Sequence, residues 1–195
     1  MKKREINMHH FLPLKSSVDY DLKRAICGVF YDFNNEVAVA SDGHILCVSK
    51  AAYNPTYKKE VERGVIIDKE GHVIEGRYPD YESIMPIWLN DYTELSIDKN
   101  KIKTWIKDVR NIAKEKQVKA MSIFIKIADH WYNAKYIEKM FRVADKFWYK
   151  TSQNQIVLYG ESDLAKVILL PMLYNANNAN ASVILRSGND IILEK

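Results

Sequence analysis

Five histidines are the residues of this sequence best suited to catalysis or metal binding: His9, His10, His44, His72 and His130. His9 and His10 are adjacent, so their side chains point in different directions, and no acidic or cysteine cluster accompanies them. The sequence contains no GxSxG, P-loop, GxGxxG or HExxH motif. We therefore expect no enzyme, no cofactor and no bound metal; a metal protein of unknown type is the alternative, and metal analysis would test it.

Basic residues form the clearest charge pattern in a chain whose net charge is +4. They recur twice at steps of four, three and four, as Lys103, Lys107, Arg110 and Lys114 and then as Lys135, Lys139, Arg142 and Lys146. On helices, these spacings place each set on one face. Two such stripes fit salt-dependent, sequence-independent contacts with the phosphates of duplex DNA, and they equally fit two solvated helix faces.

Two helices in the second half of the chain must position these stripes. Apolar residues at helical spacing predict one helix after Asp98 and another after Asn133, and both of these residues are good N-caps. Strands are predicted over 94–97, 121–129, 148–151, 155–159 and 166–172. The order of strand, helix and strands is therefore used twice.

The first half is predicted to be a meander of antiparallel strands. Asn34-Asn35 and Asp42-Gly43 tolerate positive φ, and they separate predicted strands over 26–33, 37–40 and 44–49. A further hairpin joins 65–67 to 73–75, and residues 50–64 form a connection with no amphipathic helix. Together the two halves indicate an α+β protein with helices packed on one face of antiparallel sheets.

Composition and the absence of apolar runs limit where this protein acts. The chain has 195 residues, 47% of them apolar, which is typical of a globular protein. No run is long enough to cross a bilayer, and the basic start Met-Lys-Lys-Arg is not followed by an apolar stretch. We expect a cytoplasmic protein with no membrane partner, in which Cys27 and Cys47 are buried free thiols.

Four segments carry a more specific signal: V-A-S-D-G-H-I-L over 39–46, E-G-R-Y-P-D-Y-E-S-I-M-P over 75–86, Y-N-A-K-Y over 132–136 and V-I-L-L-P-M over 167–172. In this order they resemble the V-A-T-D-G-H-R-L, D-G-R-F-P-D-Y-x-x-V-L-P, F-N-x-x-Y and Y-V-V-M-P-M segments of the bacterial β sliding clamp, the β subunit of DNA polymerase III. The resemblance implies a DNA-clamp-like fold, in which helices on antiparallel sheets line a ring around DNA.

The same resemblance implies an apolar pocket that takes short peptides of DNA polymerases and clamp loaders. By position, the peptide-binding residues would be Gly43, His44, Ile45, Leu46, Pro79, Ser83, Ile84, Asn133, Tyr136, Ile168, Leu170, Pro171 and Met172. Their aliphatic members could form an apolar floor, and Asn133 and Tyr136 could orient a peptide. The alternative is that several of them are core residues.

Departures from the family shape the functional prediction. The family chain has three domains, whereas this chain has room for a reduced, mostly β domain over 1–88, a domain with two amphipathic helices over 89–173, and a tail with a possible hairpin over 174–195. Ile45 replaces a family arginine, and Glu82 and Ser83 replace basic residues. We predict a shortened clamp-like replication and processivity factor that binds clamp-binding peptides and duplex DNA. A homo-oligomer is open, and the alternative is a stand-alone peptide-binding module or clamp competitor that does not encircle DNA.

Overall fold

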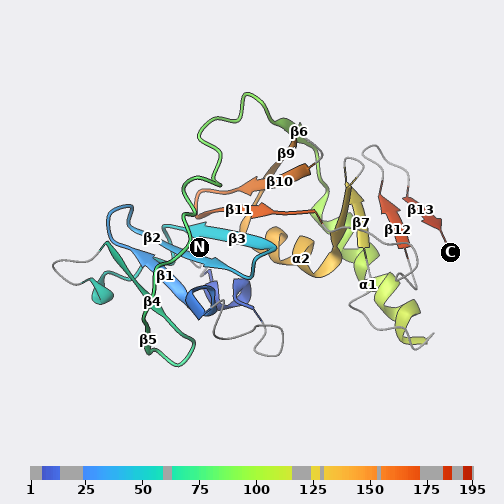
Figure 1. Cartoon of the computed structure of the whole chain (residues 1–195). Coiled ribbons are helices and arrows are strands. Elements are labelled where there is room, and N and C mark those ends of the chain that lie inside the picture. Colours follow the sequence, from blue (N-terminus) through green and yellow to red (C-terminus); the bar gives the residue numbers. More distant parts are fainter. Residues whose placement is uncertain are drawn as a thin grey trace. The chain divides into compact units, whose positions relative to one another are not determined.

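The structure, a computed structural model, describes residues 6–13, 24–58, 63–115, 124–127, 130–152, 155–171, 182–185 and 191–194 (Figure 1). The chain forms two compact units. Unit 1 comprises Met1–Leu89 and Glu161–Ile168, and unit 2 comprises Asn90–Gly160 and Leu169–Lys195. Strands dominate both units, and the described residues include two α-helices, so the predicted α+β fold class is confirmed.

Unit 1 is built on a sheet whose strand order is β5-β4-β1-β2-β3-β11. Its strands are β1 (Val29–Asp32), β2 (Val37–Ser41), β3 (Ile45–Ser49), β4 (Gly64–Ile67), β5 (Val73–Ile74) and β11 (Ala165–Leu169). The pairs β1–β2, β2–β3, β1–β4 and β4–β5 are all antiparallel, which confirms the predicted meander and the second hairpin.

Local hydrogen bonds explain the turns of this sheet. Oδ1 of Asp32 accepts the backbone N–H groups of Asn34 and Asn35, and this closes the turn between β1 and β2. Asp42 does the same for the backbone N–H groups of residues 44 and 45, and Gly43 supplies the positive φ of +89° that the second turn requires.

Short 3₁₀ segments are the helical parts of unit 1 among the described residues: η1 (Met8–Phe11), η3 (Arg24–Cys27) and η4 (Pro55–Tyr57). The predicted strand over 26–33 is therefore too long, because its first two residues lie in η3. Met8 and Phe11 are buried, and η1 contacts β2 and β3. The core of unit 1 thus lies between η1 and the apolar side chains of the central strands, such as Val39.

Unit 2 contains β6 (Thr93–Leu95), α1 (Lys99–Glu115), β7 (Phe124–Ile127), β8 (His130–Asn133), α2 (Ala134–Val143), β9 (Lys146–Ser152), β10 (Gln155–Glu161), β12 (Ser182–Leu185) and β13 (Ile191–Glu194). Strands β10, β9 and β6 are hydrogen-bonded in that order, and a second sheet has the strand order β13-β12-β7-β8. Strands β12 and β13 pair antiparallel, as a hairpin in the tail would, whereas β12 pairs with β7 in parallel. Strand β8 was not predicted from the sequence.

Both helices of unit 2 begin where the sequence predicts. Oδ1 of Asp98 accepts the backbone N–H groups of residues 100 and 101, and Oδ1 of Asn133 accepts that of Lys135. The helices bury one stripe each, which consists of Trp105, Ile106 and Val109 on α1 and of Ile137, Met140 and Phe141 on α2. Within the described ranges, no helix has the length and apolar character needed to cross a bilayer.

Candidate functional site

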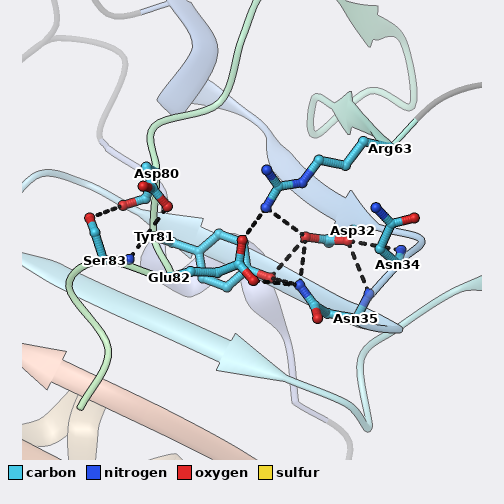
Figure 2. A network of polar contacts seen from close by, with 8 residues as sticks. All are labelled: Asp32, Asn34, Asn35, Arg63, Asp80, Tyr81, Glu82 and Ser83. Atoms are coloured by element: carbon cyan, nitrogen blue, oxygen red, sulfur yellow. Dashed lines mark hydrogen bonds and ion pairs between the residues drawn. The ribbon is translucent and has the colours of Figure 1, made fainter. Parts of the chain in front are cut away.

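The segment 78–86, which carries most of the longest clamp-like motif, is fixed to the sheet of unit 1 by two buried tyrosines. The ring of Tyr78 stacks on that of Phe30, with 5.0 Å between centroids and 10° between planes. The hydroxyl of Tyr81 donates a 2.9 Å hydrogen bond to Oδ2 of Asp32 (Figure 2). The exposed residues of this segment, Pro79 among them, are therefore presented on an anchored backbone.

Asp32 is the centre of the polar network in Figure 2. Its side chain is fully buried, and the Arg63 guanidinium lies 3.6 Å from Oδ2 and also pairs with Glu82. Burial alone would raise the pKa of Asp32, but hydrogen bonds from Asn35 and Tyr81 outweigh it and hold the pKa below its ordinary value. Because donors within the chain surround this carboxylate, it fits a structural role better than a catalytic one.

The predicted peptide-binding residues of unit 1 fall into two groups. Eight residues are involved, and the exposed ones are Gly43, His44, Pro79, Ser83 and Ile84. Ile45 and Leu46 are 1% and 7% exposed, and Ile168, which unit 1 also contains, is 1% exposed. These three side chains belong to the core, so at most they could form the floor beneath a ligand.

The predicted peptide-binding residues of unit 2 lie around the start of α2 and after β11. Asn133 is occupied as the N-cap of α2, and Tyr136 is half-buried with the ammonium groups of Lys135 and Lys139 at 5.9 and 5.1 Å from its ring centroid. Leu170 and Pro171 are half-buried. Met172 lies outside the described residues, and a pocket shared by residues of both units stays a prediction.

Unit 1 also contains two hollows of ligand size. One has a volume of about 490 Å³ and includes Pro79 and the stacked Phe30 in its wall. The other, of about 500 Å³, has Val48, Met85 and Leu164 in its wall and contains none of the predicted site residues. No local sequence signal marks the second hollow, because β11 comes beside β3 only through the pairing of the sheet.

The predicted DNA-binding residues keep most of their charge at the surface. Lys103, Lys107 and Lys114 on α1 are exposed, as is Arg142 on α2, while Lys135 and Lys139 are half-buried. Arg110 is different, because Nη1 donates a 2.7 Å hydrogen bond to Oε1 of Glu138 and Nη2 also pairs with this carboxylate. Arg110 therefore joins α1 to α2.

This ion pair also relates the two stripes to each other. Arg110 belongs to the α1 stripe, and Glu138 lies three residues after Lys135 and four before Arg142. Residues at these helical spacings are surface neighbours. Lys107 and Lys114 on α1, and Lys135 and Arg142 on α2, consequently flank the same Arg110–Glu138 contact.

One expectation about the second stripe is wrong. The spacing of the basic residues predicted Lys146 on the same helix as Arg142, but α2 ends at Val143 and Lys146 is the first residue of β9. The C-cap Ala144 has extended backbone angles, φ −110° and ψ 146°, so the helical periodicity stops before Lys146.

Among the described residues, no group of three or more histidine, cysteine, aspartate or glutamate side chains could hold a metal ion.

Comparison with known proteins shows similarity at the level of the fold. No protein-family model matches the chain, and no curated protein does. Among solved structures, the C. crescentus beta sliding clamp matches with a TM-score of 0.54 and 14% identity over 86% of this chain and 62% of that chain. The Helicobacter pylori beta clamp bound to a DNA ligase peptide matches with a TM-score of 0.52 and 14% identity over 78% and 58%.

A third clamp gives the same result. DNA polymerase III subunit beta from Borrelia burgdorferi, solved in complex with a natural product, matches with a TM-score of 0.52 and 14% identity over 86% of this chain and 60% of that chain. The chain thus spans about 60% of the length of these clamps. The fold is clamp-like, as predicted.

Proposed function

We propose that the chain is a clamp-like accessory protein of DNA replication, which binds short clamp-binding peptides and contacts duplex DNA without sequence preference. The observation that carries the proposal is the clamp-like fold, since one of the similar structures is a clamp bound to a DNA ligase peptide. The four clamp-like sequence segments support the same assignment. In this proposal the protein recruits partners and catalyses no reaction.

For the peptide site, the proposal retains the residues that the clamp resemblance selects. Ile84 is 51% exposed and follows the anchored Tyr81, so it can contact a ligand without a change in the core. Tyr136 offers an aromatic ring and a hydroxyl, a combination that is frequent among residues that dominate binding energy. Apolar contacts of this kind, together with a few polar ones, are typical of peptide pockets.

Titration of a fluorescent clamp-binding peptide tests this site. Saturable binding with a Kd in the micromolar range, about −8 kcal/mol, is expected. Ile84→Ser should weaken it, whereas Val73→Ser should not, because Val73 is equally exposed, at 52%, but lies in β5. Tyr136→Ala combined with Met172→Ala should weaken binding further. A peptide that fails to saturate, or whose binding is unchanged by the Ile84, Tyr136 and Met172 substitutions, would refute the site.

For the DNA contact, the support is the pair of basic stripes that flank Arg110 and Glu138. Binding to duplex DNA should weaken with salt, and each lysine that contacts a phosphate should contribute about 0.9 to the slope of log K against log salt. Lys107→Ala with Lys139→Ala should lower this slope by about two, while Lys58→Ala with Lys69→Ala, both exposed in unit 1, should leave it unchanged. Equal slopes for both pairs would refute the DNA-binding face.

A second candidate is a stand-alone peptide-binding module, or clamp competitor, that does not encircle DNA. The observation that favours it is that the described residues of unit 1 contain short 3₁₀ segments and no α-helix that could line a ring. Mass in solution and retention on closed circular DNA distinguish the two candidates. An oligomer that stays on circles and slides off linear DNA supports the clamp, whereas a monomer that leaves both supports the module.

A further inference from the structure

The hollow of about 500 Å³ in unit 1 is lined by none of the residues of the proposed clamp-peptide site, although Ser83 and Ile84 lie between its lining residues Glu82 and Met85 in the chain. It is lined by Val37 and Val48, at the open end of the β2–β3 hairpin, by Met85 of the anchored segment, and by Leu164 of the turn before β11. Gly43 and His44 lie at the closed end of the same hairpin, beyond the cross-strand pair Ser41 and Leu46. The hollow and the turn that carries Gly43 and His44 are therefore at opposite ends of β2 and β3.

Hydrogen bonds hold the walls of this hollow in place without a ligand. Oγ of Ser49 donates a 2.8 Å hydrogen bond to the carbonyl oxygen of Leu164 and so attaches the turn to β3. The turn itself is closed by a 2.9 Å hydrogen bond from the Ser162 N–H to the carbonyl oxygen of Ala165. On the other side, Tyr81 is bound to Asp32. A site formed in advance in this way loses little conformational entropy when a ligand binds.

The hollow combines an apolar interior with exposed positive charge. Lys50 and Lys166 line it and are exposed, and in the part of the chain that the structure describes neither has an ion-pair partner. Two carboxylates are also in the lining, but Glu82 already pairs with Arg63, which leaves Asp163 as the other acidic group. Lys50 and Lys166 thus lie in the lining beside one carboxylate, Asp163, and a second, Glu82, that shares Arg63 with Asp32.

An exposed apolar residue extends the hollow at its edge. Ile87 lines it and is 82% exposed, and the next residue, Trp88, is 76% exposed. Among the described residues of unit 1, most other large apolar side chains are buried, so these two are unusual. A ligand that fills the hollow and continues over Ile87 would remove apolar surface from water, which favours a peptide chain over an inorganic anion.

We propose that this hollow is a second peptide-binding groove, which takes an aliphatic anchor flanked by acidic residues. The anchor packs against Val48, Met85 and Leu164, and the acidic side chains pair with Lys50 and Lys166. The groove shares no lining residue with the proposed clamp-peptide site, so one chain could bind two different peptides. Its ligand differs in chemistry from a clamp-binding peptide, because its acidic residues are needed to pair with the two lysines.

Titration of the whole chain with a fluorescein-labelled Asp-Asp-Leu-Leu-Asp-Asp peptide tests the groove, with a Lys-Lys-Leu-Leu-Lys-Lys peptide as its counterpart. The acidic peptide is expected to saturate and to bind about tenfold more tightly than the basic one. Lys50→Glu with Lys166→Glu should weaken the acidic peptide by about tenfold, and Lys58→Glu with Lys69→Glu, the same charge change elsewhere on unit 1, by less than about twofold. All four lysines are exposed, so the variants are expected to fold.

Three outcomes would overturn the groove: no saturation by the acidic peptide up to about 1 mM, equal affinity of both peptides, or equal effects of the two lysine pairs. Self-association that Ile87→Ser abolishes would also overturn it, because a second copy would then be the occupant. The clamp-peptide titration distinguishes the two proposals. Tyr136→Ala, in unit 2, should affect only the clamp-binding peptide, and the Lys50 and Lys166 substitutions only the acidic peptide.

Discussion

Replacing Tyr81 by phenylalanine is the sharpest test of how the clamp-like segment is held. The hydroxyl of Tyr81 donates to Oδ2 of Asp32 at 2.9 Å, and the Asn35 side-chain amide donates to the same hydroxyl at 3.0 Å. Tyr81→Phe removes one hydroxyl and keeps the ring, which packs 6.4 Å from the ring of Phe30. The expected effect is therefore the loss of hydrogen bonds and not the loss of packing.

The size of this effect follows from the burial of both partners. Tyr81 is 5% exposed and Asp32 is 0% exposed, so water cannot replace the lost donor. A hydrogen bond to a buried charged group contributes about 1.5–3 kcal/mol, and Asp32 keeps its bonds from Asn34 and Asn35. We expect the free energy of unfolding of unit 1 to fall by about 2 kcal/mol at pH 7.

The pH dependence gives this prediction a second, independent outcome. The pKa of Asp32 is lowered from its ordinary value of 3.8, so its stabilising effect is present above pH 3.8 and is lost as the pH falls through the lower, folded-state pKa. Tyr81→Phe removes one cause of that lowering. The difference between wild type and variant should therefore shrink below pH 3.8, toward the roughly 1 kcal/mol of a neutral hydrogen bond.

Urea denaturation measures the free energy of unfolding at each pH. Hydrogen exchange of peptides from β1 and β2 assigns the change to unit 1. Tyr57→Phe is the matched control, because Tyr57 is half-buried in unit 1 and its ring packs on Tyr31. The control should change the free energy of unfolding by less than about 0.5 kcal/mol. Equal losses in both variants, or a Tyr81→Phe loss that does not change with pH, would refute the role of the hydroxyl.

Three other predictions concern unit 2 and the cysteines. Asn133→Ala should lower the stability of unit 2 to urea by about 1 kcal/mol, because α2 loses its N-cap, and an unchanged midpoint would contradict this. A double-mutant cycle of Arg110→Ala and Glu138→Ala should give a coupling of about 1 kcal/mol, since the side chains are 36% and 25% exposed; zero coupling would mean that the pair does not join the helices. Burial raises the pKa of Cys47, so native-state iodoacetamide should label it far more slowly than the partly exposed Cys27 in mass spectrometry, and equal rates would contradict the burial.

The errors of the sequence prediction show where local patterns stop being informative. Lys146 continues the spacing of Lys139 and Arg142, so periodicity alone extended the helix, but Ala144 adopts an extended conformation and β9 follows. Strand β8 was missed because its four residues run directly into the N-cap of α2, and so short a run has no alternation of its own. The site residues Ile45, Leu46 and Ile168, which were selected by resemblance, are buried, and their role as the floor of a pocket stays a prediction.

What the sequence determined by itself are the features whose hydrogen bonds reach only a few residues along the chain. Asp98 and Asn133 start the two helices, and the Asp42-Gly43 pair closes a hairpin, because caps and turns bond to backbone groups two or three residues away. The alternation of strands and helices follows from the same local signals, and so does the α+β class.

Only the tertiary structure decided which of these pieces meet. Tyr81 reaches Asp32 across 49 residues, and Ser49 reaches Leu164 across 115. These contacts depend on the pairing of strands far apart in the chain, which the alternation of apolar residues within a single strand does not specify. For this reason the anchored segment, the Arg110–Glu138 link between the basic stripes and the hollow beside Leu164 all became visible in the folded chain.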